Sequence, residues 1–61
     1  MPKVPVRTLK RFALFVDGSR IFERGRYNRS SQCYICPLVD SNGFVTDKYM
    51  NYRPTDLVEK I

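Results

Sequence analysis

Residues 9–24 of the chain read LKRFALFVDGSRIFER, two runs rich in apolar and basic side chains on either side of Asp17-Gly18. An Asp-Gly pair between two apolar runs is a strong signal for a β-hairpin, because both central residues of a type I′ turn need positive φ. The stretch therefore predicts that a strand over residues 9–16 turns at Asp17-Gly18 and pairs with a strand over residues 19–24.

A two-residue loop at this position fixes which residues of the two strands face each other. It pairs Phe15 with Arg20 and places Arg11 opposite Arg24. One face of the hairpin is then a core face, with Phe12, Leu14, Val16 and Ile21. The other face mixes basic and aromatic side chains, with Arg11, Ala13, Phe15, Arg20, Phe22 and Arg24.

The residues after this hairpin predict further short strands joined by turns. Residues 32–39 are predicted as an edge or bulged strand, because Pro37 cannot donate a ladder hydrogen bond. The polar cluster 40–43 is a turn, and residues 44–52 pair back as the next strand. Residues 54–61 begin with Pro-Thr-Asp and predict a short helical or 3₁₀ turn, or such a turn leading into a last strand.

Two prolines, Pro2 and Pro5, mark the first residues of the chain. Proline removes a backbone donor and restricts the residue before it, which favours an extended conformation. We therefore predict a flexible basic N-terminal arm over residues 1–8 and a single small β domain over residues 9–61.

The number and spacing of these elements indicate an all-β fold. We predict a small antiparallel barrel or curled sheet of four or five strands, since closure removes exposed sheet edges. The ending Tyr52-Arg53-Pro54-Thr55-Asp56-Leu57-Val58-Glu59-Lys60-Ile61 resembles the close of SH3-like small barrels. That resemblance implies a fold whose members mostly bind peptides or nucleic acid. The aromatic clusters of peptide-binding SH3 domains have no clear counterpart in this chain, which argues against proline-rich ligands.

The whole chain has a net charge of +5, and the positive charge is concentrated in its first half. Residues 1–29 hold eight basic and two acidic side chains, whereas residues 30–61 hold three basic and four acidic ones. Such asymmetry predicts an anionic partner, either nucleic acid or an acidic protein surface. A solvated face that keeps the protein soluble is the simpler alternative.

The mixed face of the first hairpin is the candidate binding site. Arg11 and Arg24 directly opposite each other repel unless an anion lies between them. Phenyl rings that stack on bases beside cations that hold phosphates are what a single-stranded nucleic acid needs. The predicted site consists of Arg11, Phe15, Arg20, Phe22, Arg24, Arg26, Tyr27 and Arg29. In the alternative interpretation the two phenylalanines are core residues and the arginines extend past them to water.

Cys33 and Cys36 have the spacing of half a zinc ribbon or of a redox pair. A structural zinc ion needs four ligands, and the chain has two cysteines and no histidine, so only a dimer could complete such a site. Residues three apart on a strand point to opposite faces, which favours two separate apolar thiols. We expect no metal and no other cofactor unless a dimer bridges zinc.

Catalytic equipment is missing from the sequence. The chain has no histidine, which is the commonest general base, and no glycine-rich phosphate loop. We therefore expect a binding module and not an enzyme, with no small-molecule substrate. No apolar run reaches the length of a membrane span, and no signal peptide is evident, so we expect a cytoplasmic protein without a membrane partner.

Two functions fit these expectations. The first is binding of RNA or single-stranded DNA through the basic and aromatic face of the first hairpin. The second is a small inhibitor or adaptor, for example of the kind that viruses use against host proteins. Such a protein docks its basic face on an acidic surface of a larger one.

Overall fold

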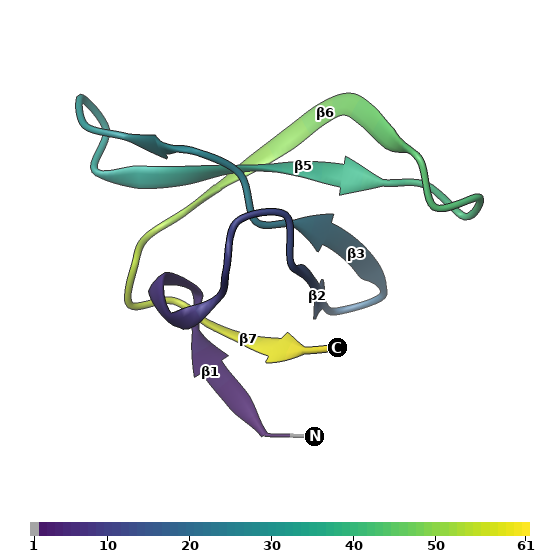
Figure 1. Cartoon of the computed structure of the whole chain (residues 1–61), viewed down its shortest axis with the longest axis horizontal. Coiled ribbons are helices and arrows are strands. Elements are labelled where there is room, and N and C mark those ends of the chain that lie inside the picture. The colour runs from purple at the N-terminus through teal and green to yellow at the C-terminus, as the bar shows by residue number, and fades with distance from the viewer. Residues whose placement is uncertain (1) are drawn as a thin grey trace.

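The computed structural model describes residues 2–61 of the protein and contains seven antiparallel strands (Figure 1). The strands are β1 (Lys3–Pro5), β2 (Leu14–Asp17), β3 (Arg20–Glu23), β4 (Tyr27–Asn28), β5 (Cys33–Val39), β6 (Val45–Tyr52) and β7 (Leu57–Lys60), with a 3₁₀ turn at Val6–Thr8. They follow the order β1-β7-β2-β3-β5-β4, and β6 pairs with the other edge of β5. The predicted all-β class and curled antiparallel sheet are confirmed, with more and shorter strands than the sequence predicted.

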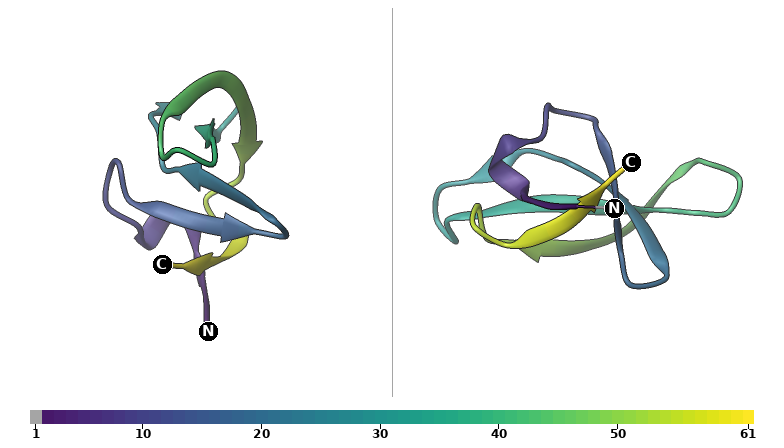
Figure 2. Two further views of the ribbon diagram at one scale, coloured as in Figure 1. Left: turned by 90° about the vertical axis from the view of Figure 1, so that its right-hand side faces the viewer. Right: turned by 90° about the horizontal axis from the view of Figure 1, so that it is seen from below.

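The sheet curls into a half-barrel that does not close, as the two views of Figure 2 make clear. Within residues 2–61, β1 pairs only with β7 at one end of the sheet, and β6 pairs only with β5 at the other. β5 is the central strand of the second half of the chain, because it pairs with β3, β4 and β6.

The β2–β3 hairpin turns one residue later than the sequence predicted. Asp17 pairs with Arg20, so the two-residue loop is Gly18-Ser19 and not Asp17-Gly18. Gly18 has a φ of +66° and Ser19 is not among the residues with positive φ. Positive φ at only the first loop residue, occupied by glycine, is the pattern of a type II′ turn, which is equally compatible with the twist of a hairpin.

Moving the loop by one residue slides the pairing by two, so the same residues share each face in both registers; the face that is buried is the opposite of the one predicted. Phe15 lies directly opposite Phe22, and the two side chains are 0% and 3% exposed. Leu14 and Ile21, predicted for the core, are 40% and 38% exposed. The prediction that Phe15 and Phe22 share an exposed face with arginines is therefore wrong, and the alternative of core phenylalanines is correct.

Three aromatic rings form the centre of the core. Phe15 and Phe22 stack with ring centroids 5.8 Å apart, and Tyr52 packs edge-on against both, at 5.2 and 5.6 Å. The Tyr52 hydroxyl donates a hydrogen bond of 2.6 Å to Asp17 Oδ2 at the hairpin end of β2. The other buried members of this cluster are Val6, Leu9, Cys36 and Val58.

The predicted N-terminal arm is part of the sheet in its described residues. Lys3–Pro5 pair with Leu57–Glu59 of β7, and the Val6 amide donates to the Asp56 carbonyl at 2.9 Å. Val6 is fully buried, which anchors the segment to the core. The prediction of a flexible arm over residues 2–8 is therefore wrong; Met1 lies outside the described residues.

The C-terminal segment takes the second of its two predicted forms, a turn followed by a strand. The Asp56 amide donates to the Arg53 carbonyl at 2.9 Å, and the Arg53 amide donates to Asp56 Oδ2 at 2.8 Å. This turn directs β7 back between β1 and β2.

Gly25 allows β5 to approach the chain between β3 and β4. A Cβ atom at this position would lie 1.8 Å from the Ile35 carbonyl oxygen, which belongs to backbone and cannot move aside. The neighbouring Ile35 amide donates to the Arg26 carbonyl at 2.9 Å, so the close approach lies within the hydrogen-bonded part of the sheet.

We expect Gly25→Ala to lower the free energy of unfolding by about 3 kcal/mol or more, because the methyl group must displace a strand of the sheet. Gly18→Ala is the matched control: its φ is +66° but nothing lies within 4 Å of an added Cβ. It should cost about 1 kcal/mol. Urea unfolding followed by circular dichroism measures both, and equal losses would contradict the close approach.

Burial, aided by the hydrogen bond to Asp17, raises the pKa of Tyr52 above the usual tyrosine value. The folded state therefore keeps a proton that the unfolded chain loses above about pH 10, so stability is complete below that pH and falls as pH rises. Above about pH 10, we expect the free energy of unfolding of the wild type to fall relative to that of Tyr52→Phe, by up to about 1.4 kcal/mol per pH unit. Urea titrations between pH 8 and pH 11 measure it, and parallel profiles would contradict the burial of this hydroxyl.

Candidate functional site

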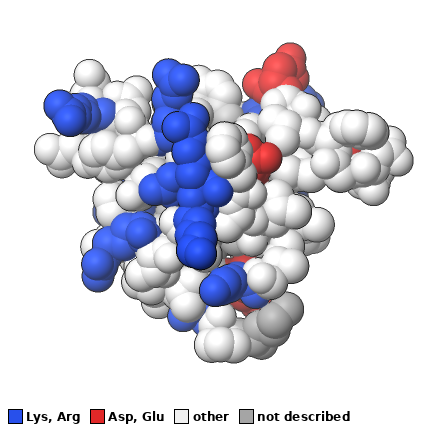
Figure 3. All heavy atoms as spheres, viewed as in Figure 1, with Lys and Arg blue, Asp and Glu red and all other residues white. Residues whose placement is uncertain are grey.

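A stripe of Lys and Arg side chains runs down the middle of the face shown in Figure 3, where Figure 1 places the loop before β2. Within residues 2–61 a single ion pair lies within 4.0 Å, Arg53 Nε to Asp56 Oδ1 at 3.4 Å. The basic residues of the N-terminal half therefore have no carboxylate partner at that distance. Their positive field is not neutralised by the protein itself.

Phe12 is the most unusual residue of this face. Its φ is +71°, a conformation that costs a bulky L-residue about 1–3 kcal/mol, and its side chain is 65% exposed. Backbone hydrogen bonds hold it there: the Phe12 amide donates to the Arg24 carbonyl at 3.0 Å, and the Arg24 amide donates to the Ala13 carbonyl at 2.8 Å. The sequence had placed Phe12 in the core.

Arg11 lies beside Phe12 in the same loop. Its guanidinium carbon is 5.0 Å from the centroid of the Phe12 ring, within the range of a cation–π contact. The Ala13 amide donates to the Lys10 carbonyl at 3.1 Å and closes a four-residue turn around the pair. The loop thus presents an aromatic ring and a cation together at the surface.

A second aromatic and basic group lies just after β3 and on β4 and β5. The Arg24 guanidinium carbon is 4.3 Å from the centroid of the Tyr34 ring, and Tyr27 packs edge-on against the same ring at 5.2 Å. Tyr27 and Tyr34 are cross-strand partners, which fixes their contact. Arg24 Nε is buried without a hydrogen-bond partner, so this guanidinium is held by stacking and not by a carboxylate.

The two groups are joined by the hydrogen bonds between Phe12, Ala13 and Arg24. We call them the basic–aromatic surface and define it by Lys10, Arg11, Phe12, Arg24, Arg26, Tyr27, Arg29 and Tyr34. Lys10, Arg11, Arg26, Tyr27 and Arg29 are exposed, and Arg24 and Tyr34 are half-buried.

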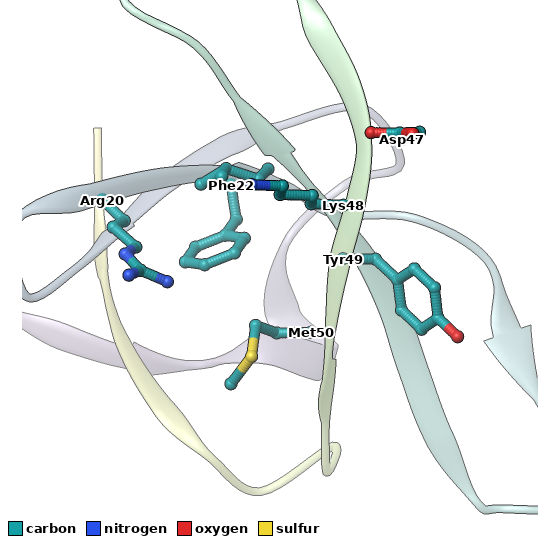
Figure 4. Close-up of a pocket in the computed structure, with 7 residues that line it drawn as sticks. Arg20, Phe22, Asp47, Lys48, Tyr49 and Met50 are labelled. Carbon is teal, nitrogen blue, oxygen red and sulfur yellow. The ribbon is translucent and has the colours of Figure 1, made fainter.

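Five of the eight predicted site residues belong to this surface: Arg11, Arg24, Arg26, Tyr27 and Arg29. Phe15 and Phe22 do not, because they are buried, and Arg20 lies at the hairpin end of β3, beside the hollow of Figure 4. Sequence reasoning missed Phe12 and Tyr34. Identifying Phe12 required knowing which face of the hairpin packs on the core, because the alternation of side chains alone leaves either face possible.

The two cysteines lie at different depths on β5. Cys36 is buried and Cys33 is half-buried, and both thiols are free. Burial raises the pKa of the Cys36 thiol, against smaller opposing effects of the Gly25 backbone and Arg24. Among residues 2–61, no three His, Cys, Asp or Glu side chains form a group that could hold a metal ion.

Comparison with known proteins found no match among protein-family models, curated proteins or solved structures. In the part of the chain that the structure describes, no helix has the length and apolar character needed to cross a membrane. The function is therefore inferred from the geometry and charge of the surface alone.

We expect Cys33 to react with a thiol reagent such as dithionitrobenzoate faster than Cys36, because Cys33 is half-buried whereas Cys36 is fully buried and burial raises its pKa. The wild type should give one faster and one slower phase. Cys33→Ser should remove the faster phase and Cys36→Ala the slower one. Equal rates at both positions in the folded protein would contradict the assigned burial.

Proposed function

We propose that the protein binds single-stranded nucleic acid, RNA or DNA, through the basic–aromatic surface, as a binding module without catalysis. The observation that carries this proposal is Phe12, an exposed phenyl ring fixed at positive φ with a guanidinium beside it. Strain of this kind persists only where the surrounding structure imposes it, and it is concentrated at functional positions.

Exposed rings beside cations suit a single strand, because every base has a π-face that can stack and every nucleotide carries a phosphate. Phe12 offers a ring to a base, and Tyr27 offers a second one. Arg11, Arg26 and Arg29 are exposed and without carboxylate partners, so they are free to contact phosphates. A duplex would present phosphates to the same cations but would keep its bases stacked on one another.

The fold supports a finer proposal. We propose that the half-barrel is an open relative of the SH3-like small barrels, because a tight turn at Arg53–Asp56 leads from one strand into a short last strand. A shared fold of this kind does not establish function. The cytoplasmic location expected from the sequence stays a prediction.

Fluorescence anisotropy with a labelled oligothymidylate and a labelled oligouridylate of about 12 nucleotides tests the proposal. If the five cations Lys10, Arg11, Arg24, Arg26 and Arg29 engage about five phosphates, the logarithm of the binding constant should fall with the logarithm of salt concentration with a slope of about −3.5. A slope near zero, or no binding at low salt, would overturn the proposal.

Phe12→Ala should weaken binding about 5- to 100-fold, because stacking on one base is worth about 1–3 kcal/mol. Phe44→Ala is the matched control, since Phe44 is 70% exposed but lies in the turn before β6, away from the surface. The charge variant Arg11→Glu/Arg26→Glu should abolish binding, whereas Lys60→Glu on β7 should have a small effect. Equal losses in Phe12→Ala and Phe44→Ala would refute stacking.

The rival function is docking of the same surface on an acidic protein. A pull-down from nuclease-treated lysate separates the two functions, with Arg11→Glu/Arg26→Glu as the control bait. A stoichiometric protein that the wild type captures and the variant does not, together with failure to bind either oligonucleotide, would replace the proposed function with the rival.

A further inference from the structure

A second surface lies on the concave side of the half-barrel, away from the basic–aromatic surface. A hollow of about 340 Å³ opens between β3, β5 and β6 (Figure 4), and its lining includes Arg20, Phe22, Leu38, Lys48 and Met50. A neighbouring hollow of about 390 Å³ shares Arg20, Leu38 and Lys48. Both hollows therefore combine apolar walls with the same two cations.

The edge of β6 borders this hollow. β6 is eight residues long, contains no proline and pairs only with β5 among the described residues. The register with β5 shifts between Pro37 and Val39, opposite residues 46–48 of β6, and the Lys48 amide donates to Thr46 Oγ1 at 3.3 Å. From Tyr49 to Tyr52 the ladder with β5 is regular, and the other edge of β6 has no strand partner within residues 2–61, which makes it a template for another strand. Residues 47–51 are exposed along its length.

Alternate residues of β6 divide between the two faces of the sheet. Figure 4 shows Met50 and Lys48 on the side of β6 that carries Phe22, and Asp47 and Tyr49 on the opposite side. Next to the free edge, the concave face thus offers a cation at position 48 and an apolar side chain at position 50.

The two cations of the hollow have no acidic partner within residues 2–61. Neither Arg20 nor Lys48 lies within 4.0 Å of a carboxylate oxygen. Asp40 lines the neighbouring hollow, but its Oδ1 accepts hydrogen bonds from the Asn42 and Phe44 amides, both at 2.9 Å. Asp47 is among the residues that line the first hollow, but its side chain is directed to the opposite side of β6 from Lys48 and Met50 (Figure 4). The charge of the hollow therefore fits an anionic ligand.

We propose that β6 accepts an extended, acidic peptide segment of a partner protein as an added antiparallel strand. Its acidic residue lies opposite Lys48, and an apolar residue two positions away lies opposite Met50 over the hollow. Main-chain hydrogen bonds supply affinity in this mode, and the alternate side chains supply specificity. The proposal is independent of nucleic-acid binding, which uses the other surface.

A second copy of the chain fits this edge poorly. Directly opposite residues in an antiparallel pair lie on the same face of the sheet. Asp47 and Lys48 lie on opposite faces of β6, so in a symmetric pair of β6 strands Lys48 of one copy cannot lie directly opposite Asp47 of the other. Two β6 strands paired in this way would leave Arg20 and Lys48 without a negative partner, whereas an acidic peptide would neutralise them.

The test uses the whole chain and a labelled peptide of about nine residues, in which Glu and Leu stand two positions apart in a threonine background. The control peptide has the same composition with Glu and Leu adjacent, so that they point to opposite faces. We expect anisotropy to show tighter binding of the first peptide. Amide chemical shifts and slowed hydrogen exchange should locate it on β6.

Lys48→Glu should weaken binding about three- to tenfold, and Lys60→Glu, a charge reversal on β7, less than about twofold. A peptide with Lys in place of Glu should prefer Lys48→Glu to the wild type, which a merely misfolded variant would not show. Equal binding of both Glu peptides, shifts confined to the basic–aromatic surface, or a dimer through β6 in sedimentation equilibrium would each overturn the proposal.

Discussion

The packing of Tyr52 against Phe15 and Phe22 is the interaction on which the rest of the structure depends. Phe15 and Phe22 come from the two strands of one hairpin and Tyr52 from the distant β6, so the three rings join the β2–β3 hairpin to the β5–β6 hairpin. The hydrogen bond from Tyr52 to Asp17 ties the same tyrosine to the hairpin end of β2. With both phenyl rings in the core, the exposed face of the hairpin carries Leu14 and Ile21, and the exposed phenyl ring of this segment is that of Phe12.

Much of the fold could be predicted from local sequence, and the failures concern features that local sequence does not determine. The hairpin at residue 18, the β5–β6 hairpin and the turn at Pro54 follow from turn chemistry, which acts over a few residues. The register did not follow, because Asp17-Gly18 and Gly18-Ser19 are both good hairpin loops and differ by one residue. The pairing of β1 with β7 depends on contacts between the two ends of the chain, which no local pattern encodes.

The candidate site was predictable to a similar degree. Charge asymmetry pointed to the N-terminal half, and Arg11, Arg24 and Tyr27 do lie on one continuous surface. What the sequence could not reveal was which aromatic rings accompany them, since that depends on which face of the hairpin packs on the core. The structure has two groups of positive charge: the guanidinium groups of Arg11 and Arg24 over aromatic rings, and the pair Arg20 and Lys48 at an apolar hollow.

The register of the β2–β3 hairpin is tested most directly by proton NMR, through Hα–Hα nuclear Overhauser effects. With Asp17 opposite Arg20, the next pair, Val16 and Ile21, is a non-hydrogen-bonded pair whose Cα atoms lie about 4.5 Å apart. We expect a strong effect between their Hα protons, together with contacts between the rings of Phe15 and Tyr52. A strong Hα–Hα effect between Phe15 and Arg20 would contradict this register, because Phe15 would then lie opposite Arg20 instead of Phe22.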